Sequence, residues 1–383
     1  MYLQKNSEYL VEMDIDYQKL LTGYYEAQYL PDGFSEISAV PDFAYNILNT
    51  MGLLYKPIVD QANIAENNQT PEWPEGKPFA VCLTHDVDDV SYFSLRQSLR
   101  PFVAPFKGFD ITQDKLKRLF NLGFNVLRAC KNQFLNDPLY CYERWLKIEA
   151  KFEAKSTFFF WPGWKNVTKH HKTDPFYDLN DRVTFDGSKC TVTEMIREIH
   201  RRGWEIGLHA SWYAYNDAEE LKLQKNALEK ALGSPIYSIR QHYLHYDIRI
   251  TPRVHSVAGF KFDSTLGFNN NIGFRFGTCY PWNIFDLGSR KKLPILEIPL
   301  IIQDVAMLNP LKGMRIDSKM AFRYVFVITE EIEKVGGVLT LLWHPNEIVN
   351  SESWNLYLKI LNYLREKNAW ITSLQEVGRW WLR

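Results

Sequence analysis

Short apolar runs alternate with helix-length amphipathic segments from about residue 76 onward, and this alternation limits the possible folds most. The runs 79–83 and 338–343 are almost wholly apolar, as is typical of strands covered on both faces. Helical patterns such as 191–202 and 319–335 lie between the runs. Strands that alternate with helices of about 10–15 residues form βαβ units around a parallel sheet. The sequence therefore predicts an α/β fold, a distorted (β/α) barrel of about seven parallel strands.

The chain changes character near residue 75. Residues 1–75 are rich in tyrosine and lack strong strand patterns, and 66–74 is polar and then broken by prolines, as in a linker. We expect an N-terminal extension or small subdomain over 1–75 and the barrel over 76–383. A helical insertion, with helices over 113–131 and 140–153, is predicted after the first strand.

Composition excludes several classes of partner and location. The 45 basic residues balance the 45 acidic ones, so nothing points to nucleic acid. No stretch approaches the roughly 18 apolar residues of a membrane span, and the first residues lack the basic and apolar regions of a secretion signal. The five cysteines form no CxxC pair, which argues against a disulfide framework. We expect a cytoplasmic protein without an integral membrane segment; its oligomeric state is not constrained.

Polar side chains stand at the ends of the expected strands. They are Asp86 and Asp88 after one strand, His209 after another, Arg240 and His242 at a third, Asp263 at a fourth and His344 at a fifth. In a barrel the carboxyl ends of parallel strands meet on one face. A single histidine after a strand is more often a structural hydrogen-bond partner than a ligand, but three histidines and two aspartates in these positions favour one shared site.

Histidine and carboxylate ligands suit zinc or another divalent transition metal. Such a metal lowers the pKa of water and polarises a carbonyl group. A carboxylate that does not bind the metal is then free to act as general base, and a histidine on the opposite side as general acid. The pattern therefore favours metal-assisted hydrolysis.

The ordered set of strand-end motifs resembles the polysaccharide deacetylase family, which contains the NodB-homology domain. Residues 84–88 (Thr-His-Asp-Val-Asp) are similar to the family's first motif, and 203–209 (Gly-Trp-Glu-Ile-Gly-Leu-His) to its second. Residues 240–243 match the third motif loosely, Asp263 stands at the fourth, and 341–344 (Leu-Leu-Trp-His) match the last. Each motif alone is weak, whereas their common order is specific.

The resemblance covers most of the chain after the N-terminal extension. It implies a distorted β/α barrel that hydrolyses acetyl groups, mostly N-acetyl, from sugars with the help of a divalent metal. By this resemblance Asp86 is the catalytic base, Arg240 orients that base and His344 is the general acid. Asp88 and His209 are then ligands of the metal.

One position departs from the family pattern. The second motif normally has a further histidine four residues after the first, where this chain has Tyr213. Three alternatives follow: His242, which stands where the family has proline, supplies the missing ligand; water or Tyr213 fills the position with weaker affinity; or the metal is lost. We adopt the first alternative, because one motif gains a histidine where another loses one.

The sequence thus predicts metal-dependent hydrolysis of an N-acetyl group on a carbohydrate or lipid-linked sugar precursor, in surface polysaccharide metabolism. We expect substrate contacts from Tyr213, Tyr243, Asp263 and Arg275. For Arg275, which glycines and aromatic residues flank, a structural salt bridge is an equal alternative. Two other functions stay open: a metal-independent amidohydrolase on the same fold, cleaving a small amide, and a catalytically inactive carbohydrate-binding relative.

Overall fold

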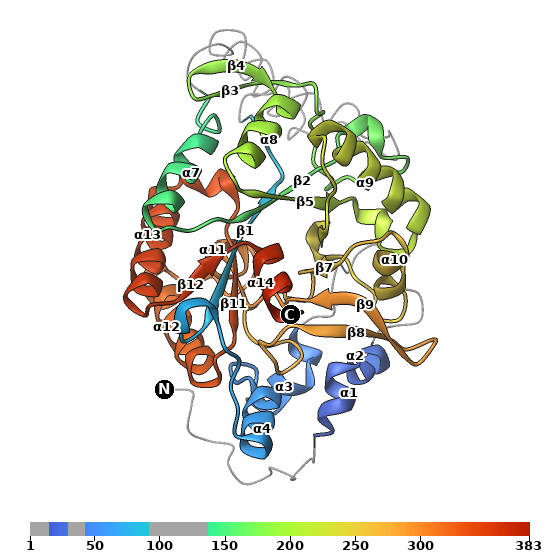
Figure 1. The fold of residues 1–383 in the computed structure, drawn as a ribbon, viewed down its shortest axis with the longest axis vertical. Coiled ribbons are helices and arrows are strands. Elements are labelled where there is room, and N and C mark those ends of the chain that lie inside the picture. The colour runs from blue at the N-terminus through green and yellow to red at the C-terminus, as the bar shows by residue number, and fades with distance from the viewer. Residues whose placement is uncertain (1–14, 30–42, 92–136) are drawn as a thin grey trace, which may run out of the picture.

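A computed structural model describes residues 15–29, 43–91 and 137–383 (Figure 1). Within these residues a ten-stranded sheet runs in the order β10-β11-β1-β2-β5-β6-β7-β9-β8, and β12 also pairs with β1. The strands are β1 (Ala80–Val87), β2 (Thr157–Phe160), β5 (Glu205–Ala210), β6 (Ser238–Gln241), β7 (Phe262–Asp263), β8 (Trp282–Asp286), β9 (Lys291–Glu297), β10 (Ile302–Gln303), β11 (Val338–Leu342) and β12 (Trp370–Thr372). A separate hairpin consists of β3 (Arg182–Phe185) and β4 (Ser188–Thr191).

Helices surround this sheet (Figure 1). They are α7 (Tyr142–Lys151), α8 (Val192–Arg201), α9 (Ala218–Leu232), α10 (Thr251–Val257), α11 (Asp304–Leu308), α12 (Ser318–Val335), α13 (Ser351–Glu366) and α14 (Leu374–Trp381). The N-terminal part adds α1 (Tyr17–Leu21), α2 (Tyr24–Tyr29), α3 (Ile47–Thr50) and α4 (Ile58–Asn67). Short 3-10 helices are η1 (Phe43–Tyr45), η2 (Pro74–Gly76), η3 (Trp164–Asn166), η4 (Trp212–Asn216), η5 (His242–Leu244) and η6 (Pro345–Val349). The predicted helix over 113–131 lies outside the described residues.

The predicted α/β barrel architecture is confirmed, and the sheet is open and mixed. Neighbouring strands pair in parallel from β10 to β9, whereas β8 runs antiparallel to β9. Among the described strands no ladder joins β8 to β10, so the barrel remains incomplete. Strand β8 was not predicted, because Asn283 and Asp286 interrupt its apolar residues and only two of its five residues are buried.

Strand β1 is longer than the apolar run that predicted it. The run ends at residue 83, but β1 continues in register with β2, with Asp86 opposite Phe159 and Val87 opposite Phe160. His85 stays buried within the strand because its ring nitrogens contact the Glu149 carboxylate and the Trp343 carbonyl, each at 2.6 Å. Asp86 therefore lies inside the end of the sheet rather than in an exposed turn.

Helix α8 follows the sequence signals closely. Thr191 caps it in a capping box with Glu194, which satisfies backbone N–H groups at the helix start. Its buried face carries Ile196 and Ile199, both without exposed surface. Burial of such a side chain stabilises the fold by about 1.5–3 kcal/mol. This packing fixes the helix that leads into β5.

The described N-terminal helices lie at one end of the molecule (Figure 1), where α4 contacts α12. The Asp60 carboxylate in α4 accepts hydrogen bonds from the Thr278 hydroxyl at 2.5 Å and the Cys279 backbone N–H at 2.7 Å. Glu26 in α2 pairs with Arg275 at 2.5 Å. These contacts attach the N-terminal part to the loop that precedes β8. None of the helices described is long and apolar enough to cross a membrane.

Candidate functional site

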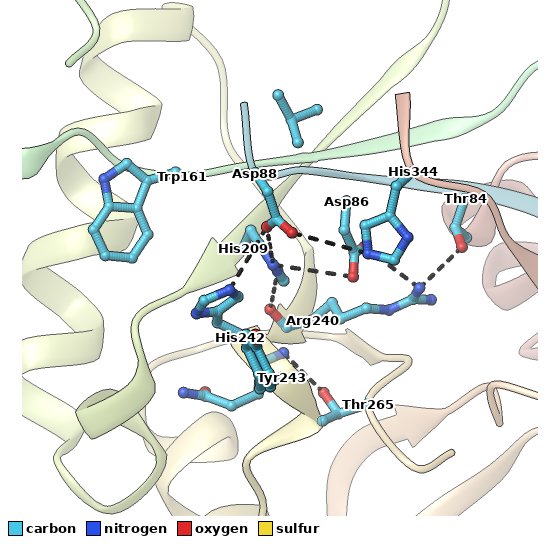
Figure 2. A network of polar contacts seen from close by, with 12 residues as sticks. Thr84, Asp86, Asp88, Trp161, His209, Arg240, His242, Tyr243, Thr265 and His344 are labelled. Carbon is cyan, nitrogen blue, oxygen red and sulfur yellow. Dashed lines mark hydrogen bonds and ion pairs between the residues drawn. The ribbon is translucent and has the colours of Figure 1, made fainter. Parts of the chain in front are cut away.

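A cleft opens where the carboxyl ends of β1, β5, β6 and β11 meet. The side chains of Asp86, Asp88, His209, His242 and His344 all line it, and Figure 2 shows them pointing toward one another. Each lies at or just past the end of a different strand, except the two aspartates, which share β1. The convergence predicted from the sequence therefore brings these residues into one site.

Asp88, His209 and His242 form a cluster with the spacing of a metal site. The Nε2 atoms of His209 and His242 lie 3.2 Å and 3.7 Å from Oδ1 of Asp88. The possible ligand atoms of the three residues all lie within 4.8 Å of one another. Both histidines are buried, whereas the Asp88 side chain is 31% exposed and faces the cleft.

The chemistry of this cluster fits a divalent cation. Nδ1 of His209 faces the Arg240 carbonyl oxygen at 3.1 Å, and Nδ1 of His242 faces an Asp174 carboxylate oxygen at 3.3 Å. A neutral imidazole that donates from Nδ1 presents a lone pair at Nε2. Both Nε2 atoms face Oδ1 of Asp88, a buried oxygen without a hydrogen bond among the described residues. Lone pairs that converge in this way repel one another unless a cation lies between them.

The local charges agree with this reading. Burial raises the pKa of Asp88, but the three neighbouring histidines lower it well below its usual range. Burial lowers the pKa of His209, but the nearby charges of Asp86 and Asp88 raise it by more, so the pKa is raised overall. The site therefore favours positive charge between these atoms, whether protons or a metal ion supply it.

Tyr213 does not line the cleft. It belongs to η4 and faces a second pocket with Tyr215 and Glu220, where the Lys169 amino group lies 3.8 Å from the centre of its ring. Tyr213 is therefore not placed to replace the family's second histidine. His242, directly after β6, is the residue next to Asp88 and His209.

Asp86 lies beside the cluster without belonging to it. One carboxylate oxygen is 3.4 Å from Nη1 of Arg240 and the other is 4.0 Å from Nε2 of His209. The Arg240 guanidinium also donates to the Thr84 hydroxyl at 3.0 Å and to the Ser264 carbonyl at 2.8 Å. These bonds hold a positive charge against Asp86. Asp86, at the end of β1, and Asp88, just after it, are thus in different positions, as their predicted separate roles require.

His344 faces the second carboxylate oxygen of Asp88, whereas His209 and His242 face the first. Its Nε2 is 4.0 Å from Oδ2 of Asp88, while its Nδ1 is 2.7 Å from Oδ1 of Asp304. Burial lowers the pKa of His344, but the charge and hydrogen bond of Asp304, with the charges of Asp88 and Asp86, raise it to about 10. A protonated imidazole on the cleft wall is a suitable proton donor.

Comparison with known proteins shows which proteins share this fold. No protein-family model and no curated protein match the chain. A solved structure of a putative polysaccharide deacetylase from Mycobacterium smegmatis aligns at a TM-score of 0.50 with 18% identity, over 81% of this chain and 92% of that chain. A probable polysaccharide deacetylase from Pseudomonas aeruginosa PAO1 aligns at 0.50 with 16% identity, over 83% and 96%. The chain has the polysaccharide deacetylase fold. The resemblance read from the motifs is confirmed at this level.

The same fold is shared with a protein named for another reaction. PuuE allantoinase aligns at a TM-score of 0.50 with 15% identity, over 83% of this chain and 95% of that chain. These low identities establish the fold and leave the reaction to the residues of the cleft.

Besides Tyr213, two further predicted substrate contacts lie away from the cleft. Asp263 is buried between Nδ1 of His255 at 2.6 Å and the Thr265 hydroxyl at 2.5 Å. Arg275 is buried in its ion pair with Glu26. Neither side chain lines the cleft, because polar partners hold both of them elsewhere. For Arg275, the salt-bridge alternative describes the structure.

Tyr243 does line the cleft and is 37% exposed, with the Lys312 amino group 5.0 Å from its ring centre. The sequence reading missed other lining residues, namely Asn269, Gln303, Asn309, Lys312, Asn346 and Glu347. It also missed Asp304, which follows the short strand β10 and so obeys the same strand-end rule as the predicted residues. That signal is easily missed because β10 has only two residues.

Proposed function

We propose that this chain is a metal-dependent hydrolase that removes an acetyl group from an amide nitrogen of a sugar or sugar-containing precursor. The observation that carries the proposal is the arrangement around Asp88. A three-residue cluster of ligand type has the Asp86 carboxylate on one flank, 4.0 Å from Nε2 of His209. The imidazole of His344 also faces the cluster, with its Nε2 4.0 Å from Oδ2 of Asp88. Hydrolysis of an amide needs these parts in this order: activation of water, polarisation of the carbonyl, and a proton for the leaving nitrogen.

Asp88, His209 and His242 would hold the metal ion. When bound, such an ion would supply activation of water and polarisation of the acetyl carbonyl group. Asp86, kept in place next to Arg240, accepts a proton from the attacking water. His344 points Nε2 into the cleft and delivers a proton to the departing nitrogen.

The proton balance closes with these two residues. The water oxygen bonds to the acetyl carbon as one water proton moves to Asp86. The carbon–nitrogen bond then breaks as the proton on Nε2 of His344 moves to nitrogen. The products are acetic acid, which ionises in solvent, and a free amine. Exchange with solvent returns Asp86 and His344 to their starting protonation.

The cleft lining supports a sugar as the substrate. Tyr243 offers a partly exposed aromatic face, and Asn269, Asn309 and Asn346 offer amide groups. A pocket of this kind orients a ligand by a few placed polar groups beside an apolar surface. The two solved deacetylases are named for polysaccharide substrates. We extend the proposal to a carbohydrate or lipid-linked precursor of a surface polysaccharide.

A second candidate is hydrolysis of a small cyclic or linear amide without metal. The small amide substrate of this candidate is favoured by the likeness to the allantoinase, whose TM-score of 0.50 equals those of the deacetylases. One assay separates the two candidates: acetate release from N-acetylated oligosaccharides, and ring opening of allantoin, each with and without a chelator. The proposal expects acetate release that the chelator stops and added Zn²⁺ restores. Chelator-resistant opening of allantoin without acetate release contradicts it.

A further inference from the structure

Asp174 is a buried carboxylate behind the metal-type cluster, in the loop between η3 and β3. One oxygen lies 3.3 Å from Nδ1 of His242 and also accepts a hydrogen bond from the Trp212 backbone N–H at 2.9 Å. The other oxygen accepts from the His171 backbone N–H at 2.8 Å. The two backbone donors thus fix this carboxylate independently of His242.

We infer that Asp174 is the positioning residue that makes His242 a metal ligand, an inference that rests on the proposed metal site. The two ring nitrogens of an imidazole lie on different sides of the ring. A fixed acceptor at Nδ1 therefore decides where Nε2 points, and here it points at Oδ1 of Asp88, 3.7 Å away. The same acceptor holds the proton on Nδ1, which leaves the Nε2 lone pair for a metal ion.

The other histidine of the cluster is supported in a different way. Nδ1 of His209 faces the carbonyl oxygen of Arg240 at 3.1 Å, within the paired strands β5 and β6. That acceptor is neutral and belongs to the sheet. His242 instead follows the end of β6, in η5, and among the described residues the strand pairing of β6 stops at Gln241. A side-chain carboxylate supplies the missing support, and its negative charge makes the imidazole a stronger donor to a metal.

Asp174 also connects His242 to η4, the segment in which Tyr213 stands where the family pattern has a histidine. Trp212, whose N–H it accepts, is the first residue of η4, and Tyr213 follows directly. The loop that lacks the usual second histidine therefore helps to hold the carboxylate that orients His242. The buried side chain of Asp174 therefore contacts both the segment that lacks the usual histidine and His242, the histidine proposed to replace it.

The test must separate metal positioning from simple packing. The variants are Asp174→Asn, which keeps the size and one acceptor, and Asp174→Ala. The matched control is Glu149→Gln, because Glu149 is also a buried carboxylate 2.6 Å from an imidazole, that of His85, and lies outside the cleft. Zn²⁺ affinity is measured by competition with a chromophoric chelator, the absorption spectrum is recorded with Co²⁺, and thermal unfolding is followed without metal.

We expect both Asp174 variants to lose Zn²⁺ affinity by about 10–100-fold, the usual effect of removing a group that orients a metal-binding histidine. Their Co²⁺ spectra should differ from that of the unaltered chain. Glu149→Gln should unfold at a lower temperature and keep its Zn²⁺ affinity and Co²⁺ spectrum. In a His242→Ala background, Asp174→Asn should cost little further affinity, because the two residues act as one unit.

Each other outcome has a definite meaning. If the unaltered chain binds Zn²⁺ and Asp174→Asn binds it equally well, this inference is overturned and the metal site stands. If the unaltered chain does not bind Zn²⁺, both are overturned. Imidazole ¹⁵N NMR of the unaltered, Zn²⁺-loaded chain tests the inference even if the variants fail to fold: a proton on Nδ1 of His242 supports it, and a proton on Nε2 overturns it.

Discussion

Nδ1 of His344 lies 2.7 Å from Oδ1 of Asp304, whose second oxygen accepts the backbone N–H of His344 at 2.6 Å. Two bonds from one buried carboxylate fix both the ring and the backbone of the residue proposed as general acid. The pairing also helps to hold the proton on that ring, because the charge and hydrogen bond of Asp304, together with the charges of Asp88 and Asp86, outweigh the effect of burial on the pKa of His344.

Asp304→Asn should therefore shift the pH dependence of catalysis. His344 acts in its protonated form, so activity persists below its pKa and falls as pH rises through it. Removing the charge of Asp304 lowers that pKa from about 10, and the alkaline limb of kcat/KM should move to lower pH by about one unit or more. The measurement is a pH profile of acetate release. An unmoved alkaline limb contradicts the pairing's role.

Asp86→Asn should separate catalysis from metal binding. Asp86 is the proposed base and lies outside the ligand cluster, so acetate release should fall by about 10²–10⁴-fold while Zn²⁺ content stays the same. Asp88→Asn, the matched change two residues along, should lower both. Equal loss of Zn²⁺ from the two variants would show that their roles are not distinct.

Tyr213→His restores the residue type that the deacetylase motif has at this position. Because Tyr213 faces the second pocket beside Lys169, the new imidazole should not reach Asp88. We expect Tyr213→His to leave Zn²⁺ affinity unchanged and to give no rescue when combined with His242→Ala. Calorimetric Zn²⁺ titration checks both, and a rescue would mean that the loop after β5 supplies a ligand after all.

The attachment of the N-terminal part should depend on pH through Asp60. Burial raises the pKa of Asp60 from 3.8 to about 6, although hydrogen bonds from Thr278 and Cys279 oppose the rise. Between these two values the folded chain binds more protons than the unfolded chain, so the free energy of unfolding falls as pH rises through this window. The contribution is about 3 kcal/mol, at 1.36 kcal/mol for each unit of pKa.

Asp60→Asn removes this titration. Urea unfolding between pH 4 and 7 should show that the difference in stability between the unaltered chain and the variant changes by a few kcal/mol across the window, in the variant's favour as pH rises. A difference that stays constant with pH would show that Asp60 does not titrate there.

The sequence predicted the part of the site that depends on local pattern. Asp86, Asp88, His209 and His344 each stand at the end of an apolar run, and convergence of parallel strands at one edge brings them together. Their supporting carboxylates were missed because each acts on a residue far along the chain. Asp174 is 68 residues from His242 and Asp304 is 40 residues from His344.

Asp263 and Arg275, two of the three predicted substrate contacts that lie outside the cleft, were misplaced for a similar reason. Flanking glycines and aromatic residues do not reveal whether Arg275 points into the cleft, since its partner Glu26 lies 249 residues away. Asp263 ends a strand, as the true cleft residues do, yet turns to His255 eight residues before it. Burial and side-chain direction decide both cases, and neither is encoded in local spacing.

Zinc titration of the unaltered chain beside His242→Ala tests the proposed site most directly. We expect the unaltered chain to bind one Zn²⁺ ion, and His242→Ala to lose affinity by more than about 100-fold, because loss of a direct ligand should exceed the effect of losing a group that only orients one. Acetate release by His242→Ala should decrease in proportion to the loss of bound Zn²⁺. Equal Zn²⁺ affinity in the two proteins, or acetate release by the metal-free unaltered chain, would contradict a metal centre built from Asp88, His209 and His242.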